Sequence, residues 1–331
     1  MSEHVVEGPY FDDLKVGDVF DESPAITLTT GLGAAHQGIL GNRLRLVLDE
    51  GLSRRVRGGN AAMAHPALVW DVAIGQSAVV TQRVVANLFY RGVAFHRAPL
   101  LGDTLATSTE VVALRQNRSK PTGLAALRAT TTDQEGRPVL DFWRCAMLPL
   151  RDVGVDTGQH ADLDTVGSPP QTEIMAGLVA GFDLDAFPAR AKVVSSGDTW
   201  RVEGGDVVSS APELARLTMN VASVHHDEFA GHDGRLVYGG HTIGLAMSQV
   251  NRALPDLVTV AGWHGCDHVG PVREGDTLYS RITAEKVEAL PGGGALAHLR
   301  VLVRARSGRG SAEHDVLDWR PIIVLPAGGG T

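Results

Sequence analysis

The sequence contains the same short motif twice, and this duplication limits the folds open to the chain. Residues 98–105 read APLLGDTL and residues 270–278 read GPVREGDTL, so that the two Gly-Asp-Thr cores stand 173 residues apart. A looser pair, LKVGDVF at 14–20 and VEGGDVV at 202–208, precedes them. Motifs that recur in the same order along a chain indicate that one structural unit has been duplicated.

A helix and several strands are predicted around each Gly-Asp-Thr motif. Before the second motif, apolar residues recur at helical spacing up to Pro255, which ends the run; they are Ile243, Met247, Val250 and Leu254. Before the first motif, Pro66 stands at a typical first helical position and an apolar run follows it. Three β-rich runs follow each motif, at 106–114, 123–132 and through 142–144, and at 279–290, 294–305 and through 318–320. The prediction is an α+β unit, a long helix followed by antiparallel strands, used twice.

A connector separates the two units. Residues 151–194 break the repeated pattern, contain Ser168-Pro169-Pro170 and are rich in Asp and Glu. We expect this segment to cross the surface, with a short helix at 174–178 and no chemistry of its own. The predicted organisation is therefore an N-terminal unit at 1–150, a linker at 151–194 and a C-terminal unit at 195–331.

Composition and charge exclude several classes of protein. With 44% hydrophobic and 21% charged residues the chain is typical of globular proteins, and its net charge of −8 argues against nucleic acid or an anionic membrane as a partner. No apolar run approaches the roughly 18 residues of a membrane span, and the first residues lack a secretory signal pattern. Two cysteines, Cys145 and Cys266, are too few for a disulfide framework. We expect a cytoplasmic protein with a small-molecule partner, and a homo-oligomer stays open.

Motifs of several common enzyme classes are absent from the sequence. There is no P-loop, no Gly-x-Gly-x-x-Gly between a strand and a helix, no Gly-x-Ser-x-Gly and no His-Glu-x-x-His. These absences argue against a P-loop nucleotidase, a Rossmann dehydrogenase, an α/β-hydrolase and a zincin metalloprotease.

The second half concentrates the histidines, and therefore the candidate chemistry. Six of the 13 histidines lie between residues 225 and 268; they are His225, His226, His232, His241, His264 and His268. Histidine titrates near neutral pH, so such a cluster indicates acid–base chemistry or a metal site. We assign His226, His232 and His241 structural roles on loops.

A metal site is the weaker interpretation of this cluster. It would use residues 225–227, or it would use His264, Cys266 and His268, which alternate along a predicted strand and would share one face. Neither spacing matches a helix-borne or knuckle-type zinc motif, so we predict no metal.

The start of the second helix offers hydrogen-bond donors for a developing negative charge. Residues 238–241 read Tyr-Gly-Gly-His and lead into the predicted helix, where glycine permits close approach and the first N–H groups are free. The corresponding segment of the first half, 64–67, places Pro66 opposite Gly240, and proline has no N–H to donate. One active site per chain, in the second half, is therefore expected.

The run 220–227, NVASVHHD, resembles the Asp-x-Asn-Pro-x-His-x-Asp signature of the MaoC-like, (R)-specific enoyl-CoA hydratases. The helix-start glycine of that family falls on Gly240, and its Pro-Val-x-x-Gly-Asp motif falls on 271–276. The duplicated layout resembles the double hot-dog branch, and within it the mesaconyl-CoA hydratases (β-methylmalyl-CoA dehydratases), through residues 86–90, 235–243 and 263–268. The resemblance covers essentially the whole chain outside the linker. It implies two hot-dog units, each a long helix wrapped by an antiparallel sheet.

The resemblance also implies a reaction, the reversible hydration of a 2-enoyl-CoA by a hydro-lyase that needs no cofactor besides its CoA thioester substrate. Gly240 N–H would polarise the thioester carbonyl and stabilise the enolate, and His225 would deprotonate a water held by Asn220 and return a proton to the α-carbon. Asn220 departs from the family, which has an aspartate there, and an asparagine cannot accept the proton. Either His225 alone is the base, or Asp227 or Asp267 supplies the missing charge.

The first half lacks a counterpart of the catalytic histidine. Its counterpart of the signature, residues 41–47, has Val47 where the second half has His225. We therefore expect the first half to be non-catalytic and to help form the acyl-CoA tunnel.

Six residues are expected to bind the substrate: Tyr238, Gly239, Ser248, Arg235, Asp267 and His264. Ser248, about two helical turns beyond Gly240, resembles a serine that the family places near its site. Mesaconyl-CoA carries a second carboxylate, for which an arginine is the natural partner. Arg235 is our choice for that role, and four others remain open: Arg43, Arg45, Arg216 and Arg252.

Two other functions remain to be tested. Hot-dog folds also host thioesterases, for which Asp227 would activate the water. Alternatively, the asparagine at position 220 marks a protein that binds acyl-CoA without turning it over.

Overall fold

The computed structural model describes residues 2–190, 193–230, 234–291 and 293–326. In this part of the chain, twelve strands form one antiparallel sheet: β1 (Val19–Phe20), β2 (Ile26–Thr27), β3 (Ala86–Phe95), β4 (Thr104–Gln116), β5 (Thr122–Thr132), β6 (Pro138–Pro149), β7 (Thr199–Arg201), β8 (Asp206–Val207), β9 (Thr259–His268), β10 (Thr277–Ala289), β11 (Ala295–Arg306) and β12 (His314–Leu325). The helices are α1 (Thr30–Leu40), α2 (Arg45–Leu48), α3 (Glu50–Arg57), α4 (Pro66–Gln76), α5 (Thr172–Leu178), α6 (Ala211–Leu217) and α7 (Gly239–Ala253), with short 3₁₀ turns η1 (Phe11–Asp13), η2 (Ser77–Thr81), η3 (Leu163–Thr165) and η4 (Ser223–His225).

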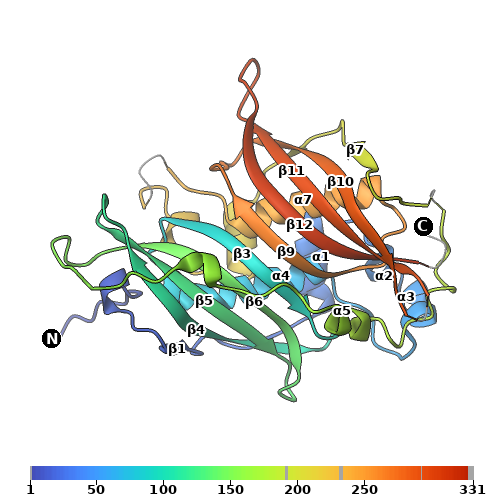
Figure 1. Cartoon of the computed structure of the whole chain (residues 1–331), viewed down its shortest axis with the longest axis horizontal. Helices are drawn as coiled ribbons and strands as arrows, with labels where there is room; N and C mark the ends of the chain where they lie inside the picture. Colours follow the sequence, from blue (N-terminus) through green and yellow to red (C-terminus); the bar gives the residue numbers. More distant parts are fainter. Residues whose placement is uncertain (1, 191–192, 231–233, 292, 327–331) are drawn as a thin grey trace.

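The sheet consists of two similar halves joined edge to edge. Its order is β1-β4-β5-β6-β3-β9-β12-β11-β10-β7, so each half contributes one block of consecutive neighbours. The halves meet where β3 pairs with β9, from Phe89 opposite Asp267 to Ala94 opposite Gly262. Figure 1 shows α4 behind the first block and α7 behind the second. The predicted layout, an α+β unit used twice, is confirmed.

Both long helices form where the apolar pattern places them, and both are buried. Every residue of α4 is buried, since this helix lies in the centre of the molecule and packs against α7 as well as the sheet. Helix α7 ends at Ala253, just before Pro255, as expected from the missing proline N–H. At Gly244 a Cβ would come within 2.5 Å of Leu40, so glycine lets α7 lie close to α1.

The two Gly-Asp-Thr motifs form the same turn for the same physical reason. Gly102 and Gly275 adopt φ values of 99° and 93°, a region that favours glycine. The following aspartate accepts a hydrogen bond from the backbone N–H three residues earlier, at 2.8 Å for both Asp103 and Asp276. Because turn and side chain support each other, the motif recurs wherever this turn is needed.

The sequence analysis paired residues 14–20 with 202–208, and the structure shows that this pairing is wrong. The turn at Gly17 and Asp18, which leads into β1, has its counterpart at Gly197 and Asp198, which lead into β7. Both glycines have a φ of 93°, and both aspartates accept a backbone N–H from three residues earlier. The residues at 202–208 are more similar in sequence to 14–20 than those around Gly197 are, but they do not form this turn.

The linker covers the outer face of the first sheet block. It contains α5, which confirms the predicted short helix, and its Leu163 is buried against Phe89 and Cys145. In Figure 1 the green trace crosses in front of the sheet. Strand β6 ends at Pro149 and β7 begins at Thr199, which agrees with linker boundaries near 150 and 195.

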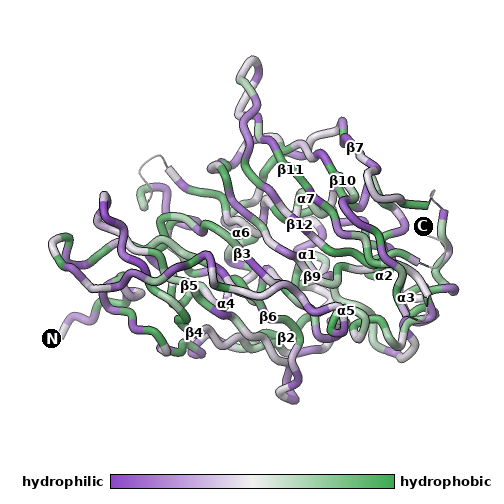
Figure 2. The backbone as a smooth tube through the Cα atoms, viewed as in Figure 1, coloured by the Kyte–Doolittle hydropathy of each residue, from purple (hydrophilic) through white to green (hydrophobic). Residues whose placement is uncertain are grey.

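Several elements were not predicted from the sequence, namely α1, α2, α3 and α6. Figure 2 shows the apolar segments gathered on the strands and on the helices behind them, with hydrophilic residues concentrated in the outer loops. None of the helices in the described ranges is long and apolar enough to cross a membrane.

Candidate active site

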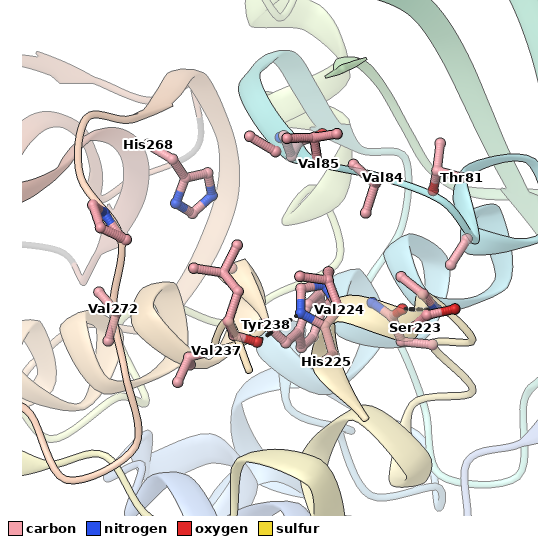
Figure 3. Close-up of a pocket in the computed structure, with 18 of the residues that line it drawn as sticks. Thr81, Val84, Val85, Ser223, Val224, His225, Val237, Tyr238, His268 and Val272 are labelled. Atoms are coloured by element: carbon pink, nitrogen blue, oxygen red, sulfur yellow. Dashed lines mark hydrogen bonds between the residues drawn. The ribbon is translucent and has the colours of Figure 1, made fainter. Parts of the chain in front are cut away.

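A cavity of about 920 Å³ lies between the two halves of the chain (Figure 3). The first half contributes the end of α4, η2, the start of β3 and Arg144 of β6, and the second contributes η4, the start of α7 and the end of β9. This size suits a small-molecule ligand. The segment at 86–90 of the first half borders the cavity, while a role in an acyl-CoA tunnel stays a prediction.

His225 enters the cavity from η4 with its imidazole held in one orientation. Its Nδ1 lies 2.9 Å from the carbonyl of Leu236, and its ring centroid lies 5.6 Å from that of Tyr238 (Figure 3). The bond to a carbonyl requires the proton on Nδ1, so the neutral ring keeps a lone pair on Nε2. The geometry therefore makes His225 a proton acceptor.

Burial keeps the His225 ring neutral. It lowers the pKa of His225 to about 4; the bond to Leu236 opposes the shift, whereas the neighbouring His226 and Arg144 act in the same direction as burial. At pH 7 the imidazole is therefore uncharged and ready to accept a proton.

Asn220 lies on the same cavity as His225, as predicted. Its side-chain Oδ1 accepts a hydrogen bond from the backbone N–H of Ala222 at 3.0 Å, and its backbone carbonyl accepts one from Nε2 of His226. Because the side-chain oxygen is engaged, the amide nitrogen is the group that Asn220 can offer to a water.

The start of α7 meets the cavity through Gly239, next to Tyr238. A Cβ at residue 239 would lie 2.7 Å from Nε2 of His268, and one at Gly240 would lie 2.1 Å from Oδ1 of Asp71. Both positions therefore need glycine. Gly240 does not border the cavity, so the residue that brings the free helix-start N–H groups to it is Gly239.

The first half holds this helix start in place. Asp71, in α4, receives a hydrogen bond from Tyr238 Oη to its backbone carbonyl at 3.2 Å, and its carboxylate Oδ2 lies 3.0 Å from Nε2 of His36. Burial raises the pKa of Asp71, while the bonds with His36 and Tyr238 oppose the shift. An acidic residue in the middle of an apolar helix was the available sequence signal, and we missed it.

The equivalent helix start in the first half is closed. Pro66 lacks an N–H, and Nδ1 of His65 accepts the N–H of Ala67 at 2.9 Å. His65 is buried and does not line the cavity. These observations support the expectation of one site per chain.

Comparisons with known proteins agree with this architecture. No protein-family model matches the chain. A β-methylmalyl-CoA dehydratase of Chloroflexus aurantiacus is 27% identical over 345 residues, which cover 98% of this chain and 97% of that protein. A mesaconyl-CoA hydratase of Cereibacter sphaeroides is 27% identical over 300 residues, which cover 87% of each chain.

Two solved structures share the fold over nearly the full length. A conserved hypothetical protein of Mycobacterium tuberculosis, described as having a double hot-dog fold, is 48% identical with a TM-score of 0.88, covering 96% of this chain and 98% of that one. A putative MaoC domain dehydratase of Chloroflexus aurantiacus is 24% identical with a TM-score of 0.85, covering 98% and 99%. This chain has the double hot-dog fold of its 48% identical relative, and it is similar over nearly its full length to MaoC-like dehydratases. The predicted fold and the predicted resemblance are thereby confirmed, and the predicted hydro-lyase class agrees with the names of the two curated relatives.

Two of the predicted substrate-binding residues lie outside the cavity. Ser248 donates its hydroxyl to the carbonyl of Gly41 at 2.9 Å, which links α7 to the end of α1. Arg235 pairs with Glu274 and Glu228 instead of lining the cavity. The four alternative arginines do not line it either; they are Arg43, Arg45, Arg216 and Arg252.

His264 and Asp267 also lie away from the cavity, on the outer face of the sheet. The pairing of β9 with β12 shifts register beside His264, because Gly265 faces Arg320 while Trp263 faces Pro321. This irregularity breaks the alternation on which the shared face of residues 264, 266 and 268 rested. His264 instead contacts His298, at 2.8 Å between Nε2 and Nδ1.

His268 is a cavity residue that the sequence analysis did not select as a binding residue. It faces the cavity opposite His225 (Figure 3), and its buried Nε2 has no hydrogen-bond partner among the described residues. Burial lowers its pKa to about 4, with the neighbouring His225 contributing.

The histidines assigned structural roles occupy different places. His241 is buried in α7 and His226 bonds to Asn220, whereas His232 lies outside the described residues. In the described ranges no group of three or more His, Cys, Asp or Glu side chains is arranged to hold a metal ion.

Proposed function

We propose that the protein catalyses the reversible hydration of a 2-enoyl-CoA thioester. The observation that carries this proposal is that two groups meet on one cavity: a neutral His225, whose Nε2 bonds to none of the described residues, and the open helix start at Gly239. Hydration of an enoyl thioester needs these two things, a base for the water and donors for the enolate oxygen. The names of the two curated relatives point to the same class of reaction.

In the proposed mechanism the thioester carbonyl accepts a hydrogen bond from the helix-start N–H at Gly239, the residue through which α7 meets the cavity. This polarisation makes the β-carbon electrophilic. His225 Nε2 takes a proton from a water held by the Asn220 amide, and the oxygen of that water bonds to the β-carbon. The α-carbon of the resulting enolate then takes a proton from the His225 imidazolium, which restores the neutral base.

A carboxylate is not required from the protein in this scheme. Among the described cavity-lining residues there is one acid, Asp227, which is exposed and accepts a hydrogen bond from the N–H of Phe229 with Oδ1. Asp267, the other candidate for the missing charge, faces away. His225 is therefore the base that the described residues support best.

For the substrate we propose mesaconyl-CoA, hydrated to β-methylmalyl-CoA. Support comes from the names of the two relatives, which share 27% of their residues with this chain over most of its length.

An assay with mesaconyl-CoA and crotonyl-CoA tests the proposal. Enoyl-thioester absorbance and free thiol are followed together on the purified protein. Loss of absorbance without thiol release is expected. Thiol release would instead make it a thioesterase that uses Asp227, and no change with either substrate would favour a protein that only binds acyl-CoA.

The pH dependence of kcat/KM should report the depressed pKa of His225. A general base works in its unprotonated form, so activity falls as pH drops through its pKa. We expect the acidic limb of kcat/KM near pH 4, where burial has moved the pKa of His225, and not near 6.5. Initial rates between pH 3.5 and 8, with circular dichroism at each pH to confirm folding, test this. An acidic limb near pH 6.5 on folded protein would contradict it.

A further inference from the structure

Arg144 is a buried cation inside the active-site cavity. It lies on β6, is 3% exposed and borders the cavity. Its Nη1 donates to the hydroxyl of Ser77 at 2.8 Å and its Nη2 to that of Thr81 at 2.9 Å, so two neutral groups hold the guanidinium. Its Nε is buried and bonds to none of the residues that the structure describes.

Arg144 has no ion-pair partner in the part of the chain that the structure describes. Among the described residues, no carboxylate lies within ion-pair distance of its guanidinium. Guanidinium keeps its proton at any pH at which the protein is folded, and burying a charge without a partner is costly. A site that retains such a group has a use for an anion from outside the chain.

The other cavity arginines differ from Arg144 in exposure and in partners. Arg83 is partly exposed, pairs with Glu7 and stacks on Tyr10. Arg273 is also partly exposed and donates to the carbonyl of Gly234. Both are placed like residues of a cavity mouth, whereas Arg144 is the one buried arginine among the described cavity-lining residues.

Arg144 shares the part of the cavity where the chemistry is expected. Burial lowers the pKa of His225, and the charge of Arg144 adds to that shift; burial raises the pKa of Tyr238, and the charge of Arg144 opposes that rise. Arg144 therefore acts on the base and on the residue beside the helix start. Thr81, which holds one of its nitrogens, lies on the same cavity as His225 (Figure 3). An anion bound here belongs to the acyl group, while the strongly charged phosphates of CoA suit the exposed mouth.

We propose that Arg144 is the specificity-determining residue of the site and binds a carboxylate at the far end of the acyl group. The substrate is then the CoA thioester of an unsaturated dicarboxylic acid. This inference rests on the proposed function and deepens it, because it derives the substrate class from a residue of the first half. It also replaces Arg235 in the role that the sequence analysis gave it.

The test measures binding, not turnover, so that it does not depend on the hydratase activity. Succinyl-CoA and butyryl-CoA have four-carbon acyl chains that differ in a terminal carboxylate against a methyl group, and neither has a double bond to hydrate. Titration calorimetry on the whole protein gives both affinities. We expect the wild type to prefer succinyl-CoA by about tenfold or more, as a charge-assisted bond of this kind provides.

Arg144→Gln should weaken succinyl-CoA binding by about 10²-fold, the usual scale for truncating a buried charge pair, and leave butyryl-CoA within about threefold. Arg144→Lys should recover part of the loss, since it restores the charge without the planar fork. The matched control is Arg128→Gln, on the adjacent strand β5, whose guanidinium stacks on Trp143 and pairs with Asp141 on the outer face. It should change neither affinity.

Three results would overturn the proposal. They are a wild type without preference for succinyl-CoA, an equal loss of both ligands in Arg144→Gln, and a loss of succinyl-CoA binding in Arg235→Gln instead. If Arg144→Gln does not fold, the wild-type preference and Arg144→Lys still decide. Failure of the hydration assay together with a carboxylate preference that depends on Arg144 would refute the proposed reaction but not this site.

Discussion

Replacing His225 by alanine is expected to lower kcat for enoyl-CoA hydration by about 10²-fold or more, the usual scale for the loss of a general base. The variant removes the one group whose orientation, through the Nδ1 bond to Leu236, leaves a basic nitrogen free on the cavity. Affinity for a saturated acyl-CoA should persist, because the helix start at Gly239 and the cavity walls remain.

His264→Ala is the matched control for this experiment. His264 belongs to the same half but lies on the outer face of β9 against His298, so its removal should leave kcat within about twofold. If His225→Ala lost less than about tenfold, His225 would not be the base, and His268, with its free Nε2, would be the next residue to replace.

Replacing Trp263 by alanine should lower the free energy of unfolding by about 3–5 kcal/mol, the range for large buried aromatic side chains. Trp263 is fully buried on β9, at the joint with β3, and its ring centroid lies 4.9 Å from Trp70 and 5.6 Å from Trp319. These rings come from α4, β9 and β12, so the cavity left behind would loosen both halves at once.

Chemical denaturation followed by fluorescence and by circular dichroism measures this effect. Trp143→Ala is the control, because Trp143 is half-buried on the outer face of β6 and stacks on Arg128. A drop for Trp143→Ala as large as that for Trp263→Ala would show that the buried cluster has no special weight.

The fold was largely predictable because its signals are local. The apolar spacing before Pro255 and after Pro66 marked both long helices, and the Gly-Asp turns marked where strands begin. Helices α1, α2 and α3 were not predicted because only a few residues of each are buried. Their apolar residues therefore form no long run at helical spacing.

The site was predictable where one short segment supplies it. His225 and Asn220 lie five residues apart on one loop, and Tyr238 and Gly239 open the helix directly after it. The other residues assigned to the site were placed wrongly. Ser248, Arg235, Asp267 and His264 all have partners or positions outside the cavity.

For the misplaced side chains that lie on strands, the reason is the phase of the strand, that is, which of its residues face inward. The first half has Trp143 followed by Arg144 and the second has Trp319 followed by Arg320, yet Arg144 is buried in the first pair and Trp319 in the second. A shift of one residue in a strand moves every side chain to the opposite face of the sheet. The Trp-Arg pair is the same in both halves, so it does not reveal that shift. Alternation with the apolar Phe142 was the one signal that could have placed Arg144 inside.

The sequence alone predicted two duplicated α+β units with a single chemical site in the second. These features could be predicted because their signals, namely apolar spacing, turn motifs and the missing N–H of Pro66, each depend on only a few neighbouring residues. Only the tertiary structure decided which first-half groups complete that site. Asp71 contacts Tyr238 behind the helix start, and Arg144 lines the cavity; both belong to the first half, which is joined to the second where β3 pairs with β9. Contacts of this kind, between segments far apart in the sequence, depend on strand register and helix packing.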